Sequence, residues 1–409
     1  MLRYFLILIL PIIVYANLVY LSNHNKELAL LESFDISSSF LYDPIMNDML
    51  VKNSAMDRNR YFFKAMNEAY LFIPEIKSIL THSEVPQGFL YLAMAESNFS
   101  IKAYSKKRAA GLWQFMPGTA KRYGLKIDEY VDERRDPIKS TYAAATYLKQ
   151  LHGRFGKWYL AAIAYNCGGG RLNRAINKAG SDDLAVLLDE DKKYIPKESR
   201  NYIRKIIALA LIGNNEQLLL SCEYEYLLNR SNANSLQAVS LPSGESLQRV
   251  AQLIAFPLDD LQKLNRHLKY DFTPPYSDKY DIYIPYGKLS DFKQKYFKSS
   301  NTNTYKIHIV TNGDNLSYIG KKYGIPYKVI MDFNKLKNSK LKLKQKLIIP
   351  VGAYKMKEKV DAKAYHLVKK GDSLESISKA YKVSIYNIKL INQLSSSLIK
   401  IGARLKIYE

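Results

Sequence analysis

The C-terminal part of the chain contains one pattern three times. Each copy has a Gly and an Asn at the same separation: Gly244 and Asn265, Gly313 and Asn334, Gly371 and Asn392. Each Gly is followed, at one fixed offset, by a Leu: Leu247, Leu316 and Leu374. Identical offsets at three places indicate a small folding unit used repeatedly rather than one large core.

The second and third copies open with a short alternating run ("YKIHIV", "YHLV") and close with another apolar run ("KLIIP", "RLKIY"). Alternation indicates strands, and two short helices fit between them. The sequence thus predicts βααβ modules over 304–352 and 364–409, joined as separate beads by polar linkers such as "FKSSNTNT". A first copy, over 230–288, is degenerate: its opening strand is poorly patterned, and "DFTPPYSDKYD" lengthens the stretch before its last strand.

Residues 61–220 are expected to form a helical domain. Apolar periodicity predicts helices at 60–80, 85–97, 137–152, 158–166 and 198–212, and no segment there alternates like a strand. Asp136 followed by Pro137 indicates a helix start, because Asp accepts from free amides and Pro fits the first turn. The glycines of "NCGGG" (166–170) are expected to end a helix in a flexible run.

One carboxylate lies inside the most apolar of these helices. In "FLYLAMAESNFS", Glu96 shares a helix face with Phe89 and Leu92, and its neighbours three and four residues away include no cation. Burial disfavours the anion, so the pKa of Glu96 is predicted to rise above the usual value of about 4.3. A glutamate paired with an Arg or Lys that the fold brings in is the alternative.

The N-terminus has the pattern of an export signal. "MLRYFLILILPIIVYAN" combines Arg3, an apolar run and a small residue, Ala16, which predicts a signal peptide over 1–16. The apolar run extends to Leu21, so an uncleaved anchor that associates the chain with a membrane is the alternative. Residues 17–60 form an N-terminal extension.

Charge and cysteine content limit which partners, metals and cofactors the chain is expected to bind. The net charge of +23 suits an anionic partner. However, the basic residues are dispersed and an export signal does not fit a nucleic-acid binder, so no nucleic-acid partner is expected. Two cysteines, Cys167 and Cys222, make no disulfide framework, and the six His occur without H-E-x-x-H or C-x-x-C. Neither a metal nor a cofactor is expected.

The repeated units resemble LysM domains, which are βααβ modules that bind polymers containing N-acetylglucosamine. The resemblance covers residues 305–350 and 365–408 and is weaker in the first copy, which puts glycan binding by that copy in doubt. Repeats that serve only as a spacer are the alternative.

The helical block resembles the goose-type-lysozyme-like domain of lytic transglycosylases. Four motifs occur in the expected order: "AMAESNF", "AAGLWQFMPGTAKRYGL", "AAIAYNCGGGRL" and "IPKESRNYIRKI". With the export signal and the LysM units, the chain is similar to the membrane-bound lytic transglycosylase D family. Two features depart from that family. Cys167 stands where Ala is usual, and the N-terminal cysteine that is often lipidated is absent.

The resemblance implies a multidomain fold, in which an all-α lysozyme-like catalytic domain precedes the LysM modules. It also implies a periplasmic enzyme that cleaves the MurNAc-β-1,4-GlcNAc bond of peptidoglycan. Glu96 would act first as acid and then as base toward the muramic C6 hydroxyl, leaving a 1,6-anhydro-MurNAc end. Because this nucleophile is internal, no second carboxylate is required. A hydrolytic muramidase, which differs in its product, and a non-catalytic wall-binding scaffold, which would not depend on Glu96, are the alternatives.

Seven further residues are assigned to the substrate site: Ser105, Gln114, Met116, Tyr165, Asn166, Glu198 and Tyr202. The first two can hydrogen-bond sugar hydroxyls or the acetamido group, and Met116 can contact a ring face. Tyr165 and Asn166 can orient Glu96 or the substrate. Glu198 and Tyr202 share a helix face, which places Glu198 as a support and Tyr202 near the acid. Core packing of Met116 and Tyr165, and an ion pair of Glu198 with Arg200 or Lys205, are the alternatives.

Overall fold

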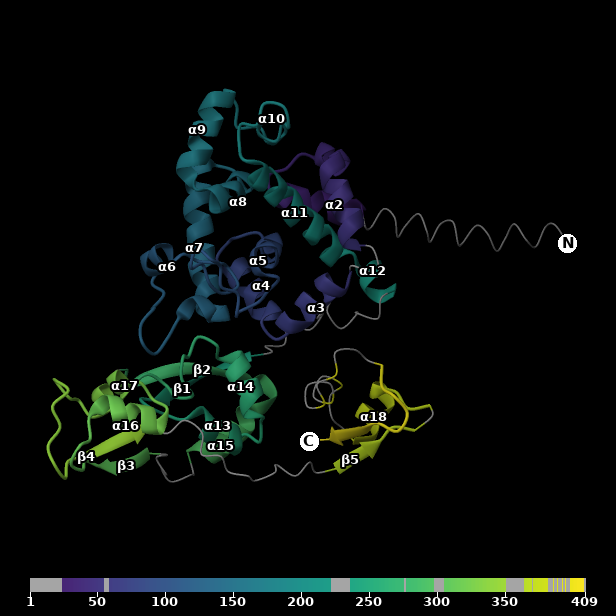
Figure 1. Ribbon diagram of the computed structural model, residues 1–409. Helices are drawn as coiled ribbons and strands as arrows, with labels where there is room; N and C mark the ends of the chain where they lie inside the picture. The colour runs from purple at the N-terminus through teal and green to yellow at the C-terminus, as the bar shows by residue number, and fades with distance from the viewer. Residues whose placement is uncertain are drawn as a thin grey trace. The chain divides into compact units, whose positions relative to one another are not determined.

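The computed structural model describes residues 24–54, 59–221, 236–275, 277–297 and 305–350, and in the last module 364–369, 371–381, 398–407 and positions 385, 388, 392 and 394. They form two compact units. Figure 1 labels their helices and strands. The first contains the described residues up to Leu241 together with Leu264–Tyr270 and Tyr280–Leu289, and the second contains the remainder. No helix in the described part is long and apolar enough to cross a membrane. The predicted signal or anchor over 1–16 lies outside the described residues.

The part of the first unit described between residues 24 and 221 confirms the all-helical prediction for the catalytic block. Its segments are 24–33, η1 (Ser38–Tyr42), α2 (Pro44–Ser54), α3 (Asn59–Ala69), α4 (Ile73–His82), η2 (Gln87–Phe89), α5 (Leu90–Ser97), α6 (Pro117–Arg122), η3 (Glu133–Arg135), α7 (Pro137–Phe155), α8 (Trp158–Cys167), α9 (Gly169–Ala179), α10 (Leu184–Leu187), α11 (Lys197–Asn214) and α12 (Glu216–Ser221). The β structure described between 59 and 221 consists of isolated bridges. As predicted, the Asp136 carboxylate accepts from the amides of Ile138 and Lys139, both at 2.9 Å, at the start of α7.

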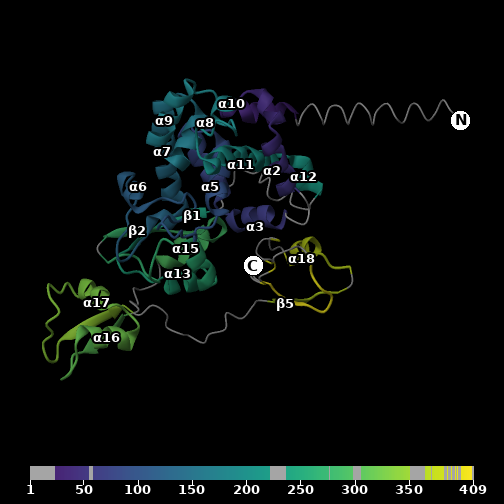
Figure 2. The same cartoon turned by 45° about the horizontal axis from the view of Figure 1, so that its top comes forward.

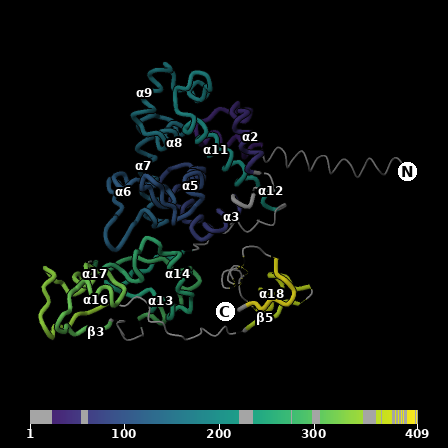
Figure 3. Tube along the Cα trace, in the orientation of Figure 1, coloured from purple at the N-terminus to yellow at the C-terminus, as the bar shows by residue number. Residues whose placement is uncertain are grey.

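Prolines and glycines move several helix ends away from the predicted positions. The expected helix over 60–80 is broken by a turn at 70–72, and α4 carries Pro74 in its first turn, where no amide hydrogen is needed. The expected helix over 85–97 begins, after Pro86, as η2. Gly168, with φ +85°, alone separates α8 from α9, so the glycine run is a tight turn between helices rather than a flexible segment. The Cα trace of α8 and α9 is drawn in Figure 3.

The helix that carries Glu96 is surrounded by other helices. α11 packs against α2, α5 and α8, and α4 packs against α5 and α7 (Figures 1 and 2). Leu90, Leu92 and Met94 of α5 are buried, as the apolar sequence predicted. Each fully buried side chain of this size contributes about 1.5–3 kcal/mol. α5 is therefore held firmly along its length.

The first two C-terminal modules have the predicted βααβ order, and the described residues of the third contain two strands and one helix. The first comprises β1 (Leu236–Pro242), α13 (Leu247–Leu253), α14 (Leu258–Leu264) and β2 (Lys279–Pro285), followed by η5 (Tyr286–Lys288) and α15 (Leu289–Tyr296). The second comprises β3 (Tyr305–Ile309), α16 (Leu316–Tyr323), α17 (Tyr327–Phe333) and β4 (Lys346–Pro350). The third contains β5 (Ala364–Leu367), α18 (Leu374–Tyr381) and β6 (Arg404–Ile407). Each strand pair forms a two-stranded sheet, antiparallel in the second and third modules.

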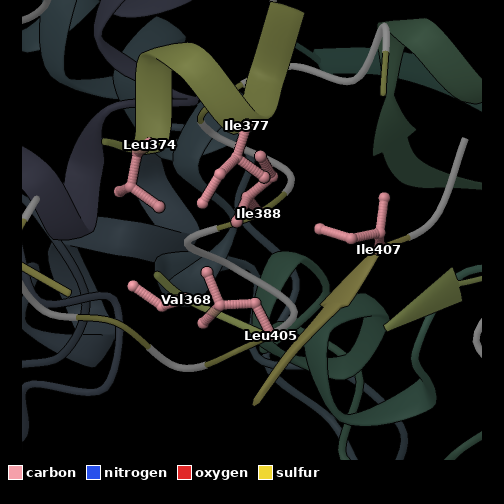
Figure 4. Close-up of a cluster of buried hydrophobic side chains, with 6 residues drawn as sticks. All are labelled: Val368, Leu374, Ile377, Ile388, Leu405 and Ile407. Carbon is pink, nitrogen blue, oxygen red and sulfur yellow. The ribbon is translucent and has the colours of Figure 1, made fainter. Parts of the chain in front are cut away.

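The third module has a small apolar core of its own. It consists of Val368, Leu374, Ile377, Ile388, Leu405 and Ile407, whose side chains point toward one another in Figure 4. The core includes Leu374, the Leu that follows the repeated Gly. Leu247 and Leu316 are equally buried in their own modules. The repeated Leu is thus a core residue of each module.

The repeated Asn ties the second helix to the closing strand. The Asn265 side chain donates to the Tyr283 carbonyl at 2.8 Å and accepts from the Tyr283 amide at 2.7 Å. Asn334 makes the same pair of bonds with Ile348, both at 2.7 Å. The Asn side chain thus bonds to both the amide and the carbonyl of one strand residue, as a neighbouring strand would. This explains why Asn recurs at this position.

The first module departs from the prediction of separate beads. Its segments Leu264–Tyr270 and Tyr280–Leu289 belong to the same compact unit as the helices of the catalytic block. A bridge pairs Val131 with Leu268, and the Lys269 amide donates to the Tyr130 carbonyl at 2.8 Å. Backbone pairing of this kind joins the segment 264–270 to the helical block.

We expect Asn265→Ala to lower protection from hydrogen exchange in β2 more than Asn334→Ala lowers it in β4. Asn265 is 1% exposed, so its loss leaves the amide and carbonyl of Tyr283 unpaired in the interior, at about 1–3 kcal/mol. The bonds of Asn334 lie at the surface, where water can replace them. Mass-spectrometric exchange on the full chain measures both, with Asn312→Ala in an exposed turn as control. A larger loss at β4 would contradict this account.

Candidate active site

Glu96 lies in the last turn of α5, where the backbone is strained. The helix ends at Asn98 with φ +50°, and Phe99 follows with φ +58° and a buried ring. Two successive non-glycine residues in the left-handed region cost on the order of 1–3 kcal/mol each and persist only where packing imposes them. The turn fixes the end of the helix beside the carboxyl group.

The carboxyl group of Glu96 is partly buried and bonds to a tyrosine. The Tyr202 hydroxyl, from α11, donates to Glu96 Oε1 at 2.5 Å. Within the described residues no Lys or Arg forms an ion pair with Glu96. The nearby Lys205 instead donates to the Ala95 carbonyl at 2.9 Å. The alternative of a glutamate paired with a cation is therefore not observed.

Burial raises the pKa of Glu96, as the sequence predicted. The hydrogen bond from Tyr202 and the charge of Lys205 oppose this shift, and the carboxylate of Glu198 adds to it. The balance favours the protonated acid to a higher pH than for an exposed glutamate. Burial and the charge of Glu96 also raise the pKa of Tyr202 well above its ordinary value, so its hydroxyl remains a donor.

α11 contributes two more residues near the site. The Ser199 hydroxyl donates to Asn166 Oδ1 at 2.7 Å, which fixes the side chain at the end of α8. Glu198 is exposed in the first turn of α11. The expected alternative for it, an ion pair with Arg200 or Lys205, does not form, because Arg200 pairs with Glu190 at 2.7 Å. Lys205 bonds to Ala95, as described above.

The loop that follows Ser105 is hydrogen-bonded to α8 and to α5. The Tyr165 hydroxyl, from α8, donates to the Trp113 carbonyl at 2.7 Å, and the Ser97 hydroxyl donates to the Leu112 carbonyl at 2.8 Å. Trp113 itself is buried, and its indole donates to Thr141 Oγ1 at 2.9 Å. Tyr165 thus bonds to this loop rather than to Glu96, although the charge of Glu96 helps raise its pKa.

The remaining predicted residues shape and line the loop. Ser105 Oγ accepts from the Ala109 amide at 3.0 Å. Gln114 has φ +47°, and its side chain donates to the Gly111 carbonyl at 2.8 Å. Met116 is 44% exposed, which excludes the alternative of a core residue. Its apolar side chain is available to a ligand.

Sequence reasoning did not identify four residues that hold the site: Ser97, Trp113, Ser199 and Lys205. Ser199 and Lys205 lie three residues before and after Tyr202, so helical spacing could have placed them on its face. Ser97 and Trp113 act through backbone carbonyls of a loop, and no sequence pattern indicates such bonds. Among the described residues no cluster of three or more His, Cys, Asp or Glu could hold a metal ion.

Comparison with known families now defines the class of protein. Residues 75–187 match the transglycosylase SLT domain, residues 308–350 and 366–407 match the LysM domain, and residues 235–301 match the LysM-like domain of lytic transglycosylase MltD. The chain is thus a lytic transglycosylase domain followed by LysM modules. It is 30% identical over 331 residues to membrane-bound lytic murein transglycosylase D of Escherichia coli (strain K12), covering 77% of this chain and 71% of that protein. The chain belongs to the membrane-bound lytic murein transglycosylase D family.

Two further matches cover smaller parts of the chain. Peptidoglycan transglycosylase gp16 of Escherichia phage T7 is 38% identical over 121 residues, 29% of this chain and 9% of that protein. The solved 70 kDa soluble lytic transglycosylase SLT70 of Escherichia coli is 27% identical, covering 33% of this chain and 23% of its own, with a TM-score of 0.30. A TM-score this low supports no argument, so the assignment rests on the sequence matches.

We expect Glu96→Gln to raise the melting temperature at pH 7–8 and to have little effect near pH 4. A carboxyl group whose folded-state pKa is raised stabilises the fold below its unfolded pKa, and this contribution is lost as pH rises through the folded pKa. Gln is neutral at every pH, so the stability of the variant does not decrease in this way. Its side-chain oxygen can still accept from Tyr202. Thermal unfolding at several pH values measures the effect, with the exposed Glu68→Gln as control. A gain that grows toward acid pH would contradict the raised pKa.

Proposed function

We propose that this chain is a peptidoglycan lytic transglycosylase in which Glu96 is the acid and base. The observation that carries the proposal is the carboxyl group of Glu96, whose pKa is raised by burial and which accepts a hydrogen bond from the Tyr202 hydroxyl. A general acid must be protonated when it acts and must recover its proton, and a raised pKa favours the protonated form.

The reaction needs no water and no cofactor. Glu96 gives its proton to the glycosidic oxygen as the bond from C1 of MurNAc to that oxygen breaks, and GlcNAc leaves with a free 4-hydroxyl. The N-acetyl oxygen of the substrate stabilises the cation at C1. The C6 hydroxyl then attacks C1 and returns its proton to Glu96, which closes the 1,6-anhydro ring. Tyr202 bonds to Oε1 of Glu96, so Oε2 is the oxygen that exchanges the proton.

Tyr202 and Glu198 have opposite effects on this cycle. Donation from Tyr202 stabilises the Glu96 anion formed after the first transfer. The charge of Glu198 disfavours that anion and so promotes reprotonation. We assign Glu198 to the support of the acid, and we favour the transglycosylase over the muramidase because residues 75–187 match the transglycosylase SLT domain.

The other residues bind the glycan. Ser105 and Gln114 offer polar groups to sugar hydroxyls or the acetamido group, and Met116 offers an exposed apolar contact to a ring face. Asn166, fixed by Ser199, and Tyr165, fixed on the loop, are assigned to orienting Glu96 or the substrate from α8. These groups outnumber the charged ones, as suits a largely neutral sugar chain.

The second and third modules bind the enzyme to peptidoglycan. Both match the LysM domain, and several weak sites on one polymer raise the effective concentration of the enzyme there. Together with the export pattern at the N-terminus and a relative named as membrane-bound, this supports a location in the cell envelope. We place the enzyme in the periplasm, with residues 1–16 as signal peptide or anchor.

The product tests the mechanism. We expect purified sacculi digested by this enzyme to yield 1,6-anhydro-MurNAc ends, because the C6 hydroxyl is the nucleophile. Such ends resist borohydride and weigh one water less than hydrolytic ends. Mass spectrometry after borohydride treatment distinguishes them, and mostly reducible ends would make this enzyme a muramidase.

Glu96→Gln is the matched control for that digestion. Gln keeps the volume and the contact with Tyr202 but cannot transfer a proton, so activity should fall by at least the roughly 10²–10⁴-fold of one acid–base group. Retention of more than about a tenth of the wild-type rate would instead favour the scaffold alternative.

Removing the two LysM modules should separate binding from turnover. We expect truncation after Ser300 to lower affinity for intact sacculi more than turnover of a short soluble glycan, because effective concentration matters only on a polymer with many sites. Pull-down with sacculi and initial rates on the short glycan measure the two quantities. Equal losses would mean that the modules support the catalytic fold.

A further inference from the structure

The first LysM-like module lacks a trio of side chains that the other two share. In the second module His308 lies between Asp314, at 2.9 Å, and the Tyr323 hydroxyl, at 3.1 Å. In the third, His366 lies in the same way between Asp372, at 2.8 Å, and Tyr381, at 3.3 Å. The corresponding positions of the first module hold Val239, Glu245 and Ile254. It has therefore diverged from the two copies that match the LysM domain.

Polar side chains of that module instead bond to a buried group of acids in the catalytic block. The Tyr280 hydroxyl donates to Glu133 Oε1 at 3.0 Å, and the Tyr283 hydroxyl lies 2.9 and 3.0 Å from the two oxygens of Asp136. The Asp132 amide donates to the His267 carbonyl at 2.8 Å. Asn265 pins the backbone of Tyr283, so its hydroxyl is aimed from a fixed position.

Asp132 and Asp136 flank η3, Glu133 is its first residue, and η3 carries the buried guanidinium of Arg134. Arg134 is 3% exposed and forms a bidentate pair with Asp132, at 2.8 and 2.7 Å. Burial lowers the pKa of His267, so that ring does not neutralise the acids. A buried ion pair of this kind is rigid, because displacing either partner leaves an uncompensated charge in the interior.

The Arg134 guanidinium also bonds to both ends of the loop 108–115, which we call the substrate loop. Arg134 Nη1 donates to the Arg108 carbonyl at 2.6 Å and to the Phe115 carbonyl at 3.2 Å. Between them, Gly111 has φ +80° and approaches so closely that an added Cβ would lie 1.7 Å from the Arg134 carbonyl oxygen. Gln114 lies in this loop, and Met116 directly follows it. The loop is therefore clamped to η3 by one side chain and one close backbone contact.

We propose that the first LysM-like module is a positioning element of the catalytic site, which holds η3 through Tyr280 and Tyr283 and, through Arg134, the loop 108–115. Arg134 is the positioning residue, since it acts on the substrate through the loop. The inference rests on the proposed function, because its effect is read as turnover.

The double variant Tyr280→Phe/Tyr283→Phe tests it with little risk to the fold. Asp136 keeps its two helix-start amides, and Glu133 keeps the Lys126 amide and the Lys139 ammonium. We expect kcat on a short soluble glycan to fall on the order of tenfold, as for a small misplacement of substrate groups. KM and sacculus binding should stay unchanged. Tyr286→Phe, 53% exposed in the same module, is the matched control and should leave kcat unchanged.

Two further measurements separate positioning from loss of folded protein. Hydrogen exchange in residues 108–115 should rise in the double variant while α5 and α11 keep their protection. Arg134→Lys retains the charge but not the fork of donors, so it should lower kcat as well. The variant that combines Arg134→Lys with Tyr280→Phe/Tyr283→Phe should have a kcat no lower than that of the more impaired of the two parent variants. Substitutions at coupled residues do not have additive effects.

A raised KM with weaker sacculus binding and unchanged kcat would overturn the proposal and make the module a glycan-binding site. A fall in kcat with unchanged exchange in 108–115, or additive losses, would overturn it too. Failure of the proposed function would give a different result, because the wild-type enzyme would then produce reducible ends. That result does not depend on the comparison of kcat values.

Discussion

The hydrogen bond between Tyr202 and Glu96 is the contact on which the catalytic site depends. It joins α11 to the end of α5, and it is the one direct bond that the described residues make to the carboxyl group. Burial alone would push the pKa of Glu96 upward, and the phenol opposes that shift. An acid–base group needs this compromise, because a pKa raised too far would yield an acid that holds its proton too tightly to give it up.

The helices that surround α5 explain how the contact is maintained. α11 packs against α5 and α8, so one rigid helix presents Tyr202 to the acid and Ser199 to Asn166. The strained residues Asn98 and Phe99 lie two and three positions after Glu96. Their cost is covered by the buried apolar side chains of α5, which a site built on a loop would lack.

Sequence patterns predicted those parts of this structure that depend on local spacing. The helices, the cap at Asp136 and the βααβ order follow from periodicity and from one or two residue types. The raised pKa of Glu96 followed from its apolar neighbours. The contacts of Arg134 with the carbonyls of Arg108 and Phe115 could not be predicted, because backbone carbonyls carry no sequence signal. The same reason hid the bond from the Tyr165 hydroxyl to the Trp113 carbonyl, because the sequence indicated only that Tyr165 can orient Glu96 or the substrate.

The three modules show how one repeat can serve two purposes. The repeated Gly, Leu and Asn maintain the module itself, and all three copies keep them. Residues outside this frame are free to change, and in the first copy Tyr280 and Tyr283 bond to acids of the catalytic block instead of leaving the module independent. A module on a free linker adds only effective concentration, whereas one bonded to η3 can fix the position of a catalytic loop. The difference lies in a few hydroxyl groups on a shared backbone.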